Sequence, residues 1–270
     1  MHRIIVTLGP FTVYSYGLML ALAFIIGTYL AHKRAKAAGI SPDKVTDLIF
    51  YILVFSLLGA RLFFVLVNFE YYKSHLLDAF KVWEGGLVFY GGLICGFGAA
   101  AWFLKKHKIP IWKTLDILSP SLALGIALGR VGCFLNGCCY GKLGGAWGVC
   151  FPGKENPPAF SQQALDGLIP PTAAYSLPVI PTQAYDALVN LAIFCLLLFL
   201  EKRKKPDGFL FLFFILLYSL NRFIIEGFRY YEQNFIVFGV VTLSQLISIA
   251  LALASAVMLF KQSAAGRHGK

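Results

Sequence analysis

Long apolar stretches separated by short polar segments dominate the pattern of this chain. Roughly 20 apolar residues cross a bilayer as a helix, so each such stretch predicts a membrane-spanning helix. Seven stretches have approximately this length, at residues 13–31, 46–68, 87–104, 115–136, 184–200, 208–226 and 237–260. The pattern therefore predicts an all-α, polytopic membrane protein with about seven transmembrane helices in a single membrane domain, residues 1–270.

The first stretch lacks a small-residue cleavage site and is followed by the basic run His32-Lys33-Arg34. We interpret it as a retained anchor rather than a removed signal peptide. Composition supports the membrane class, because 58% of the residues are hydrophobic and only 14% are charged. A soluble domain of this length does not cover so much apolar surface.

The basic residues indicate the topology. The net charge is +11, which in a soluble chain would favour a nucleic-acid partner. Fifteen of the 24 Lys and Arg residues lie in alternate connections, whereas the intervening ones carry six. The four basic segments are 32–45, 105–114, 201–207 and 261–270. The positive-inside rule places them in the cytoplasm, with the amino terminus outside and the carboxy terminus inside. No nucleic-acid partner is needed to explain the charge.

Three arginines lie inside predicted spans: Arg61, Arg130 and Arg222. Each occupies the second half of a span that runs outward, so all three are expected in the outer half of the bilayer. An ionisable group at membrane depth costs at least ~2.5–3.5 kcal/mol. Their combined charge exceeds what Glu226 can balance, and we therefore expect an external anion. The planar fork of arginine suits phosphate, which points to an anionic phospholipid head group.

Arg222 and Glu226 are four residues apart and share one helix face, with Arg229 a further turn along. Two interpretations remain open for this pair. It forms part of a functional anion site, or it is an intramembrane salt bridge that only fixes helix packing.

The longest connection, at about 137–183, is predicted to be external and is rich in Gly and Pro. Its seven prolines exclude a long helix. A long connection of this kind either covers a site that opens to the outer face or is a passive linker. The sequence leaves both interpretations open.

The chain contains six cysteines. Two of them, Cys95 and Cys195, lie in apolar spans and are expected to be core residues. The other four gather near the outer boundary of the membrane: Cys133, Cys138, Cys139 and Cys150. The C-x4-C-C arrangement lacks the paired C-x2-C spacing of a structural zinc site, so no metal is expected. Free packing thiols and a disulfide from Cys150 to Cys138 or Cys139 both remain open. A thiol oxidoreductase is the weakest reading, because no C-x-x-C motif occurs.

The run Gly129–Gly141 resembles the signature of the bacterial prolipoprotein diacylglyceryl transferase family, G-R-x-G-N-F-x-N-G-E-x-x-G. Further blocks are similar to those of the family, in the same order, across nearly the whole chain. They are Tyr16-Gly17-Leu18-Met19, Gly59-Ala60-Arg61, Gly85-Gly86-Leu87 with Gly91-Gly92, Pro181-Thr182-Gln183-Ala184-Tyr185-Asp186, and Arg222-Phe223-Ile224-Ile225-Glu226 with Arg229.

The resemblance implies the first step of lipoprotein maturation. The family transfers the diacylglyceryl group of phosphatidylglycerol to the lipobox cysteine thiol of a prolipoprotein. A thioether forms and glycerol-1-phosphate leaves. Such an enzyme is expected as a multi-pass protein of the bacterial inner (cytoplasmic) membrane, with its site facing the outer leaflet and no cofactor.

The resemblance also implies roles for individual residues. Arg130 would hold the phosphate of phosphatidylglycerol, and Arg222 would stabilise the charge on the departing phosphate. Glu226 would orient Arg222, while Asn136 would hydrogen-bond the head group. The further candidates for substrate binding are Arg61, Tyr16 and Arg229.

The sequence departs from the family pattern at the proton step. The histidine that the family has before Gly-Gly is Tyr90 here. A phenol titrates near pH ~10, so Tyr90 is a poor base unless a neighbouring positive charge lowers its pKa. Cys133 replaces the first signature asparagine, and Cys138-Cys139 replaces the Glu-x pair. Two alternatives to the transferase follow: a divergent relative with another acceptor, and a non-catalytic protein that binds or transports anionic phospholipid.

Overall fold

In the computed structural model of the chain, the residues that can be described are 3–8, 11–81, 85–145, 147–203, 205–230, 236–237 and 241–268. They form two compact units. The larger unit contains residues 1–27 and 118–270, and the smaller unit contains residues 28–117. The boundary passes through two continuous helices, α1 (Ser15–Ala37) and α5 (Ile111–Asn136). The expectation of a single domain stays a prediction.

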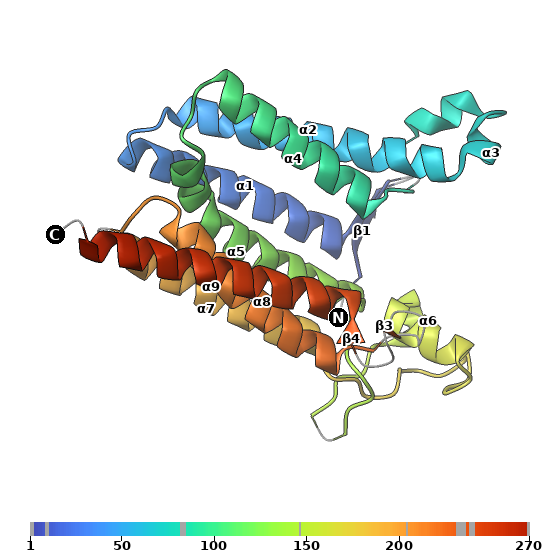
Figure 1. Cartoon of the computed structure of the whole chain (residues 1–270). Coiled ribbons are helices and arrows are strands. Elements are labelled where there is room, and N and C mark those ends of the chain that lie inside the picture. Colours follow the sequence, from blue (N-terminus) through green and yellow to red (C-terminus); the bar gives the residue numbers. More distant parts are fainter. Residues whose placement is uncertain are drawn as a thin grey trace. The chain divides into compact units, whose positions relative to one another are not determined.

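Seven long helices within the described residues correspond to the seven apolar stretches (Figure 1). Besides α1 and α5 they are α2 (Pro42–Val67), α4 (Phe89–Lys106), α7 (Thr182–Glu201), α8 (Phe209–Phe228) and α9 (Leu243–His268). Six are long and apolar enough to cross a membrane, and α4 is not among them. It has 18 residues and ends with two lysines. The all-α membrane class is confirmed, whereas the number of spans and the orientation of the termini stay predictions.

The smaller unit is built on the pair of helices α2 and α4, which pack through small residues. A methyl group added at Gly91 of α4 would lie 2.5 Å from the carbonyl oxygen of Gly59 on α2. At Gly96 it would lie 2.3 Å from the hydroxyl of Ser56. Small residues allow this close backbone approach. After α2 the chain forms the short helix α3 (Phe69–Tyr72) and the 3-10 turn η1 (Leu76–Phe80).

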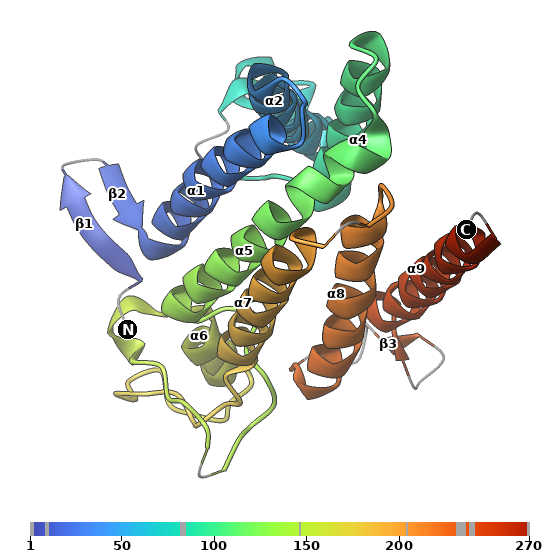
Figure 2. The same cartoon turned by 90° about the vertical axis from the view of Figure 1, so that its left-hand side faces the viewer.

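The larger unit has a helical core between α5, α7 and α8. The buried side chains of this core are Ala123, Ile193, Leu197, Leu210 and Phe214. Helix α9 packs along α8 in both views (Figures 1 and 2). A hairpin of β1 (Ile4–Leu8) and β2 (Phe11–Tyr14) leads into α1, as Figure 2 shows. A second antiparallel pair, β3 (Ile236–Val237) and β4 (Val241–Thr242), follows α8 and precedes α9 in the sequence.

The connection between α5 and α7 is folded rather than extended. It contains the 3-10 turn η3 (Gly153–Glu155) and the eight-residue helix α6 (Pro158–Leu165). Leu143 and Val149 form antiparallel bridges to Val179. A small core of its own contains Tyr140, Phe151, Ala159 and Val179. The absence of a long helix from the described part of this connection agrees with its prolines.

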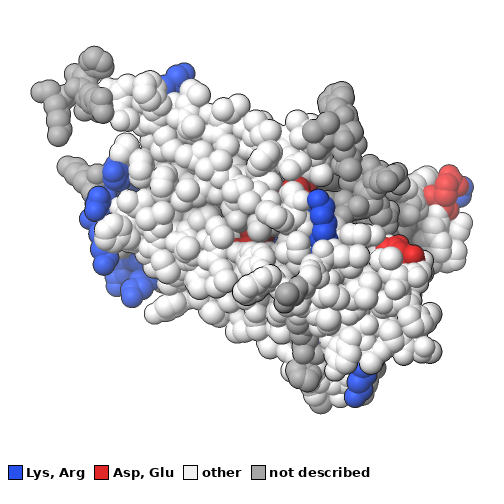
Figure 3. Space-filling view, turned by 90° about the horizontal axis from the view of Figure 1, so that it is seen from below, with Lys and Arg blue, Asp and Glu red and all other residues white. Residues whose placement is uncertain are grey.

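The surface fits an apolar environment. On the face seen in Figure 3, Lys and Arg side chains gather mainly at one end, and most of the remaining surface is uncharged apart from a few charged patches. Uncharged helix surfaces with basic ends are typical of membrane proteins.

Candidate active site

Arg130 is anchored by a buried carboxylate. It lies near the end of α5, and its Nε is 2.8 Å from Oδ2 of Asp186 in the first turns of α7. The other carboxylate oxygen, Oδ1, accepts hydrogen bonds from Nδ2 of Asn190 at 2.7 Å and from Nδ2 of Asn221 on α8 at 2.6 Å. Asp186 is 2% exposed. This network joins α5, α7 and α8 around one ion pair, in which the two asparagine amides hold the carboxylate that faces the guanidinium.

The pairing corrects one step of the sequence analysis. Glu226 was expected to be too little to balance the arginines in spans, but Asp186 supplies a second carboxylate and pairs with Arg130. The signal was present in the sequence, because Asp186 is an acidic residue near the outer end of the predicted span 184–200. A census of acidic residues in spans, beside that of the arginines, would have found it.

Arg130 still has hydrogen-bonding capacity to spare. Only its Nε takes part in the contact with Asp186, and among the described residues no group hydrogen-bonds to its two terminal nitrogens, Nη1 and Nη2. The side chain is 18% exposed. The guanidinium is therefore held from one side while its donor pair stays available for an oxyanion.

A second ion-pair group surrounds Glu226 on α8. Its Oε2 lies 2.8 Å from Nη2 of Arg222 and 3.7 Å from Nη1 of Arg229. Its Oε1 accepts a hydrogen bond from the hydroxyl of Thr242 at 3.1 Å. Glu226 and Arg222 therefore form an ion pair, and the role of Glu226 in orienting Arg222 for catalysis stays a prediction. Nη1 of Arg222 is buried without a hydrogen-bond partner in the part of the chain that the structure describes.

The turn after α5 connects the two ion-pair groups. Hydrogen bonds from the thiols of Cys133 and Cys138, followed by the positive charges of Arg229 and Arg130, lower the pKa of Cys139. Both arginines therefore act electrostatically on the same turn. The three guanidinium groups of Arg130, Arg222 and Arg229 stand against two carboxylates, Asp186 and Glu226. One positive charge is left in excess among these five groups.

Two predicted substrate-binding residues lie at the edge of this region. Tyr16, at the start of α1, is half-exposed. Gly132 allows α5 to approach it closely, because a methyl group added at Gly132 would lie 3.2 Å from the Tyr16 ring. Asn136 accepts a hydrogen bond at its Oδ1 from Nε of Arg3 at 3.1 Å. Sequence reasoning missed the Arg3 contact. The roles of Tyr16 and Asn136 in binding substrate stay predictions.

The remaining predicted residues, Arg61 and Tyr90, belong to the smaller unit. The Arg61 guanidinium is buried and donates four hydrogen bonds to backbone carbonyls, at 2.6–3.1 Å. The acceptors are the carbonyls of Asp78, Ala79, Gly85 and Gly86. Arg61 therefore holds the segment that follows α3. Tyr90 on α4 is exposed, with its ring against that of Phe89. Their catalytic and binding roles stay predictions.

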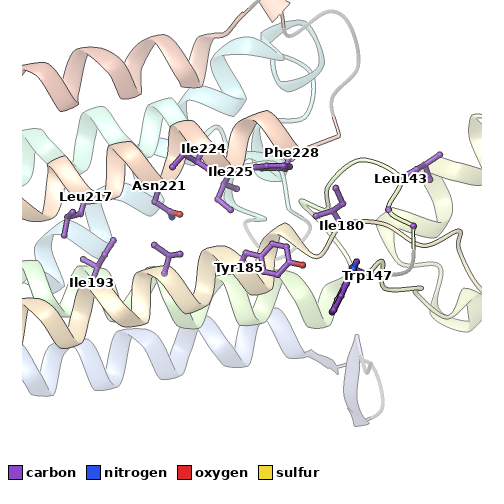
Figure 4. Close-up of a pocket in the computed structure, with 13 residues that line it drawn as sticks. Leu143, Trp147, Ile180, Tyr185, Ile193, Leu217, Asn221, Ile224, Ile225 and Phe228 are labelled. Carbon is purple, nitrogen blue, oxygen red and sulfur yellow. The ribbon is translucent and has the colours of Figure 1, made fainter.

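An apolar cavity of about 780 Å³ lies between α7, α8 and the connection that precedes α7 (Figure 4). Tyr185 of α7 and Ile225 of α8 face each other across it. Trp147, which belongs to the connection, lies at one end of the cavity. Asn221 is one of the few polar residues in its lining, and the same side chain donates to Asp186. The cavity thus borders the network that holds Arg130.

The sequence profile described as prolipoprotein diacylglyceryl transferase matches residues 3–261. The chain belongs to the prolipoprotein diacylglyceryl transferase family. The resemblance read from Gly129–Gly141 is thereby confirmed. The chain is 32% identical to the phosphatidylglycerol–prolipoprotein diacylglyceryl transferase of Geobacillus kaustophilus, over 98% of this chain and 94% of the relative.

Other members of the family are similarly close. The protein of the same name from Thermosynechococcus vestitus is 33% identical over 92% of this chain and 88% of the relative. That of Bacillus anthracis is 30% identical over 100% of this chain and 95% of the relative. The similarity therefore spans both units, including the turn after α5.

Proposed function

We propose that this protein is a phosphatidylglycerol–prolipoprotein diacylglyceryl transferase, in which Arg130 and Arg222 bind and stabilise the lipid phosphate. One observation carries the proposal. Each of these two arginines is anchored by a carboxylate, and each keeps a terminal nitrogen without a described hydrogen-bond partner. Such groups are built to receive an anion.

The reaction exchanges one bond for another. The thiolate of the acceptor cysteine attacks the glyceryl carbon that carries the phosphate ester, and a carbon–sulfur bond forms. The carbon–oxygen bond to the phosphate breaks, and glycerol-1-phosphate leaves with the electron pair. Negative charge therefore develops on the phosphate as the bond breaks.

Arg130 fits the binding of the phosphate in the ground state. Asp186 holds its Nε, so the guanidinium plane is set before the lipid arrives. Preorganisation of this kind lowers the ordering cost of binding. The paired Nη donors would then bond two phosphate oxygens at once.

Arg222 fits the stabilisation of the leaving group. Glu226 fixes its Nη2, and the buried Nη1 lacks a described partner. A buried donor gains most when a charged acceptor is close, because the surroundings screen the interaction poorly. Arg222 would therefore bind the phosphate more strongly as its charge grows.

The apolar cavity supports a lipid donor rather than a free phosphate. Its lining from α7 and α8 is predominantly aliphatic and aromatic (Figure 4), which suits an acyl chain. Asn221 lies in the lining and contacts Asp186. An acyl chain in the cavity would thus lie beside the network that holds the phosphate-binding arginine.

Further assignments rest on the resemblance. Tyr90 would take the proton of the acceptor thiol, and Tyr16, Asn136 and Arg229 would contact substrate, whereas Arg61 uses its donors on backbone carbonyls. The acceptor would be the lipobox region of a prolipoprotein. The protein would lie in the bacterial inner membrane with its site at the outer leaflet.

The deciding experiment is an adduct assay. Purified protein is reconstituted in vesicles of phosphatidylglycerol and mixed with a lipobox peptide, and the peptide mass is measured. We expect a mass increase of one diacylglyceryl group, of which the glyceryl group stays on the cysteine after the two acyl esters are cleaved, as a thioether requires. A peptide with Ser in place of Cys and vesicles of phosphatidylcholine serve as controls. Lipid binding without any adduct would instead indicate a non-catalytic lipid-binding protein.

A further inference from the structure

Three cysteine sulfurs meet beside the arginines of the site. Cys133 lies in the last turn of α5, and Cys138 and Cys139 lie in the turn that follows. Their Sγ atoms all lie within 4.8 Å of one another. Cys133 is buried and the other two are half-buried, and all three are free thiols.

The turn that brings them together is built by specific contacts. Gly137 takes the left-handed conformation with φ 73°, and the amide of Cys138 donates to the carbonyl of Cys133 at 3.1 Å. Cys139 also has a left-handed backbone, with φ 61°. Side chains of few residue types other than glycine tolerate this conformation, so its presence indicates a constrained position.

Helix α7 holds the same turn from outside. The hydroxyl of Thr182 donates to the carbonyl of Cys139 at 3.0 Å, and Nε2 of Gln183 donates to the carbonyl of Cys138 at 2.7 Å. Both side chains are buried. The positions of the two cysteines are therefore fixed by their backbones rather than by chance contacts of their side chains.

The sulfur separations suit a metal ion. A metal–thiolate bond is about 2.3 Å long, so three sulfurs around a metal ion in a plane are about 4.0 Å apart. The largest separation allowed by the structure, 4.8 Å, exceeds this by less than 1 Å. Rotation about the Cα–Cβ bonds is sufficient to close such a gap.

We propose that Cys133, Cys138 and Cys139 form a three-thiolate site for a soft metal ion, with Cu(I) as its preferred occupant. The donor set is purely sulfur, without His, Asp or Glu among the clustered ligands. Soft thiolates select Cu(I) over hard cations such as Mg²⁺. Arg130 and Arg229 act electrostatically on Cys139 and would offset the negative charge of the complex.

This site was not expected from the spacing of the cysteines. The C-x4-C-C pattern differs from the paired motifs of structural zinc sites, and a turn with two left-handed residues is needed to bring its sulfurs together. The test of the proposal is independent of the transferase reaction, since it measures the binding of an ion and needs no lipid or peptide.

The first test measures Cu(I) affinity in detergent under anaerobic, reducing conditions, by competition with a chromophoric Cu(I) chelator. We expect one equivalent bound per chain, and X-ray absorption with three sulfur neighbours at about 2.3 Å. Cys133→Ser, Cys138→Ser and Cys139→Ser should each weaken binding at least about 10-fold. Cys95→Ser and Cys195→Ser are the matched controls and should bind as the unaltered protein does.

The second test uses the unaltered protein, so it does not depend on the folding of a variant. Cu(I) should protect the three clustered thiols from maleimide, while the exposed Cys150 reacts at an unchanged rate. Equal labelling of all cysteines with and without Cu(I) would overturn the proposal. So would a Cys138–Cys139 disulfide that resists reduction, or an unchanged affinity in Cys139→Ser.

Discussion

Arg61 and Arg130 look alike in the sequence and differ in their surroundings. Each lies in the outward half of a predicted span and follows a small residue. Arg61 donates four hydrogen bonds to carbonyls of its own unit and is 6% exposed. Arg130 is held through Nε alone, and its terminal nitrogens have no described hydrogen-bond partner. A buried arginine is thus a structural clamp in one unit and a candidate ligand in the other.

The difference between these two arginines shows that the role of a charged side chain at membrane depth depends on its hydrogen bonds. A guanidinium has five N–H donors, and its availability depends on how many of them the protein uses. Asp186 and Glu226 each fix an arginine by one nitrogen, whereas backbone carbonyls use all three nitrogens of Arg61. The count of unpaired donors, more than the presence of arginine, marks the site.

The largest effect is expected at Arg130. Arg130→Ala should lower the rate of adduct formation at least about 100-fold, because the phosphate loses a preorganised charged donor pair. Arg130→Lys keeps the charge but not the fork, so it should recover only a small part of the activity. The adduct assay measures both. Activity of Arg130→Ala within about threefold of the unaltered protein would contradict the proposed role.

A smaller effect is expected at Asp186, which positions Arg130 without reaching the lipid. Asp186→Asn should raise the KM for phosphatidylglycerol and lower kcat/KM by about 10- to 100-fold, since the guanidinium loses its anchor. Asp186→Glu restores the charge and should recover part of the loss. A fall in thermal stability with unchanged KM would show instead that Asp186 serves only helix packing.

At Arg61 we expect a substitution to change the stability of the protein more than its activity. Arg61→Ala leaves several buried carbonyls without a donor, so the free energy of unfolding should fall by about 2–4 kcal/mol. Adduct formation by the folded fraction should change less than about 10-fold. Thermal unfolding and the adduct assay, run on the same preparation, separate the two quantities. A large loss of activity with unaltered stability would restore Arg61 as a phosphate ligand.

The smallest effect is expected at the interface between α2 and α4. Gly91→Ala should destabilise the protein by about 1–3 kcal/mol, because the new methyl group would lie 2.5 Å from the carbonyl oxygen of Gly59. Gly98→Ala is the matched control on the same helix, with no atom within 4 Å of the added group. It should be neutral or slightly stabilising, by helix propensity. Equal stability of the two variants would mean that the crossing is looser than described.

Several features could be predicted because they depend on local pattern. The seven apolar stretches became seven long helices, since length and apolarity decide helix formation in a membrane. The pairing of Arg222 with Glu226 followed from their spacing of four on one helix. The family was recognised from Gly129–Gly141 and confirmed by the match over residues 3–261.

Other features could not be predicted, because they join residues far apart in the chain. Asp186 and Asn221 approach Arg130 only when α5, α7 and α8 pack together. Asn136 meets Arg3 across more than 130 residues of sequence. The three sulfurs converge through a turn with left-handed backbone at Gly137 and Cys139, which α7 holds from outside.

The sequence by itself determined the class of protein, the approximate spans, the family and the presence of arginines inside spans, where a charge is energetically unfavourable. Hydrophobicity and helical spacing are local properties, and they are readable one segment at a time. The tertiary structure decided which arginine has donors without a partner among the described residues, which carboxylate anchors it, and that three cysteine sulfurs lie together. Those outcomes depend on which groups from distant segments meet, because a buried donor is satisfied or left open only by its neighbours in space.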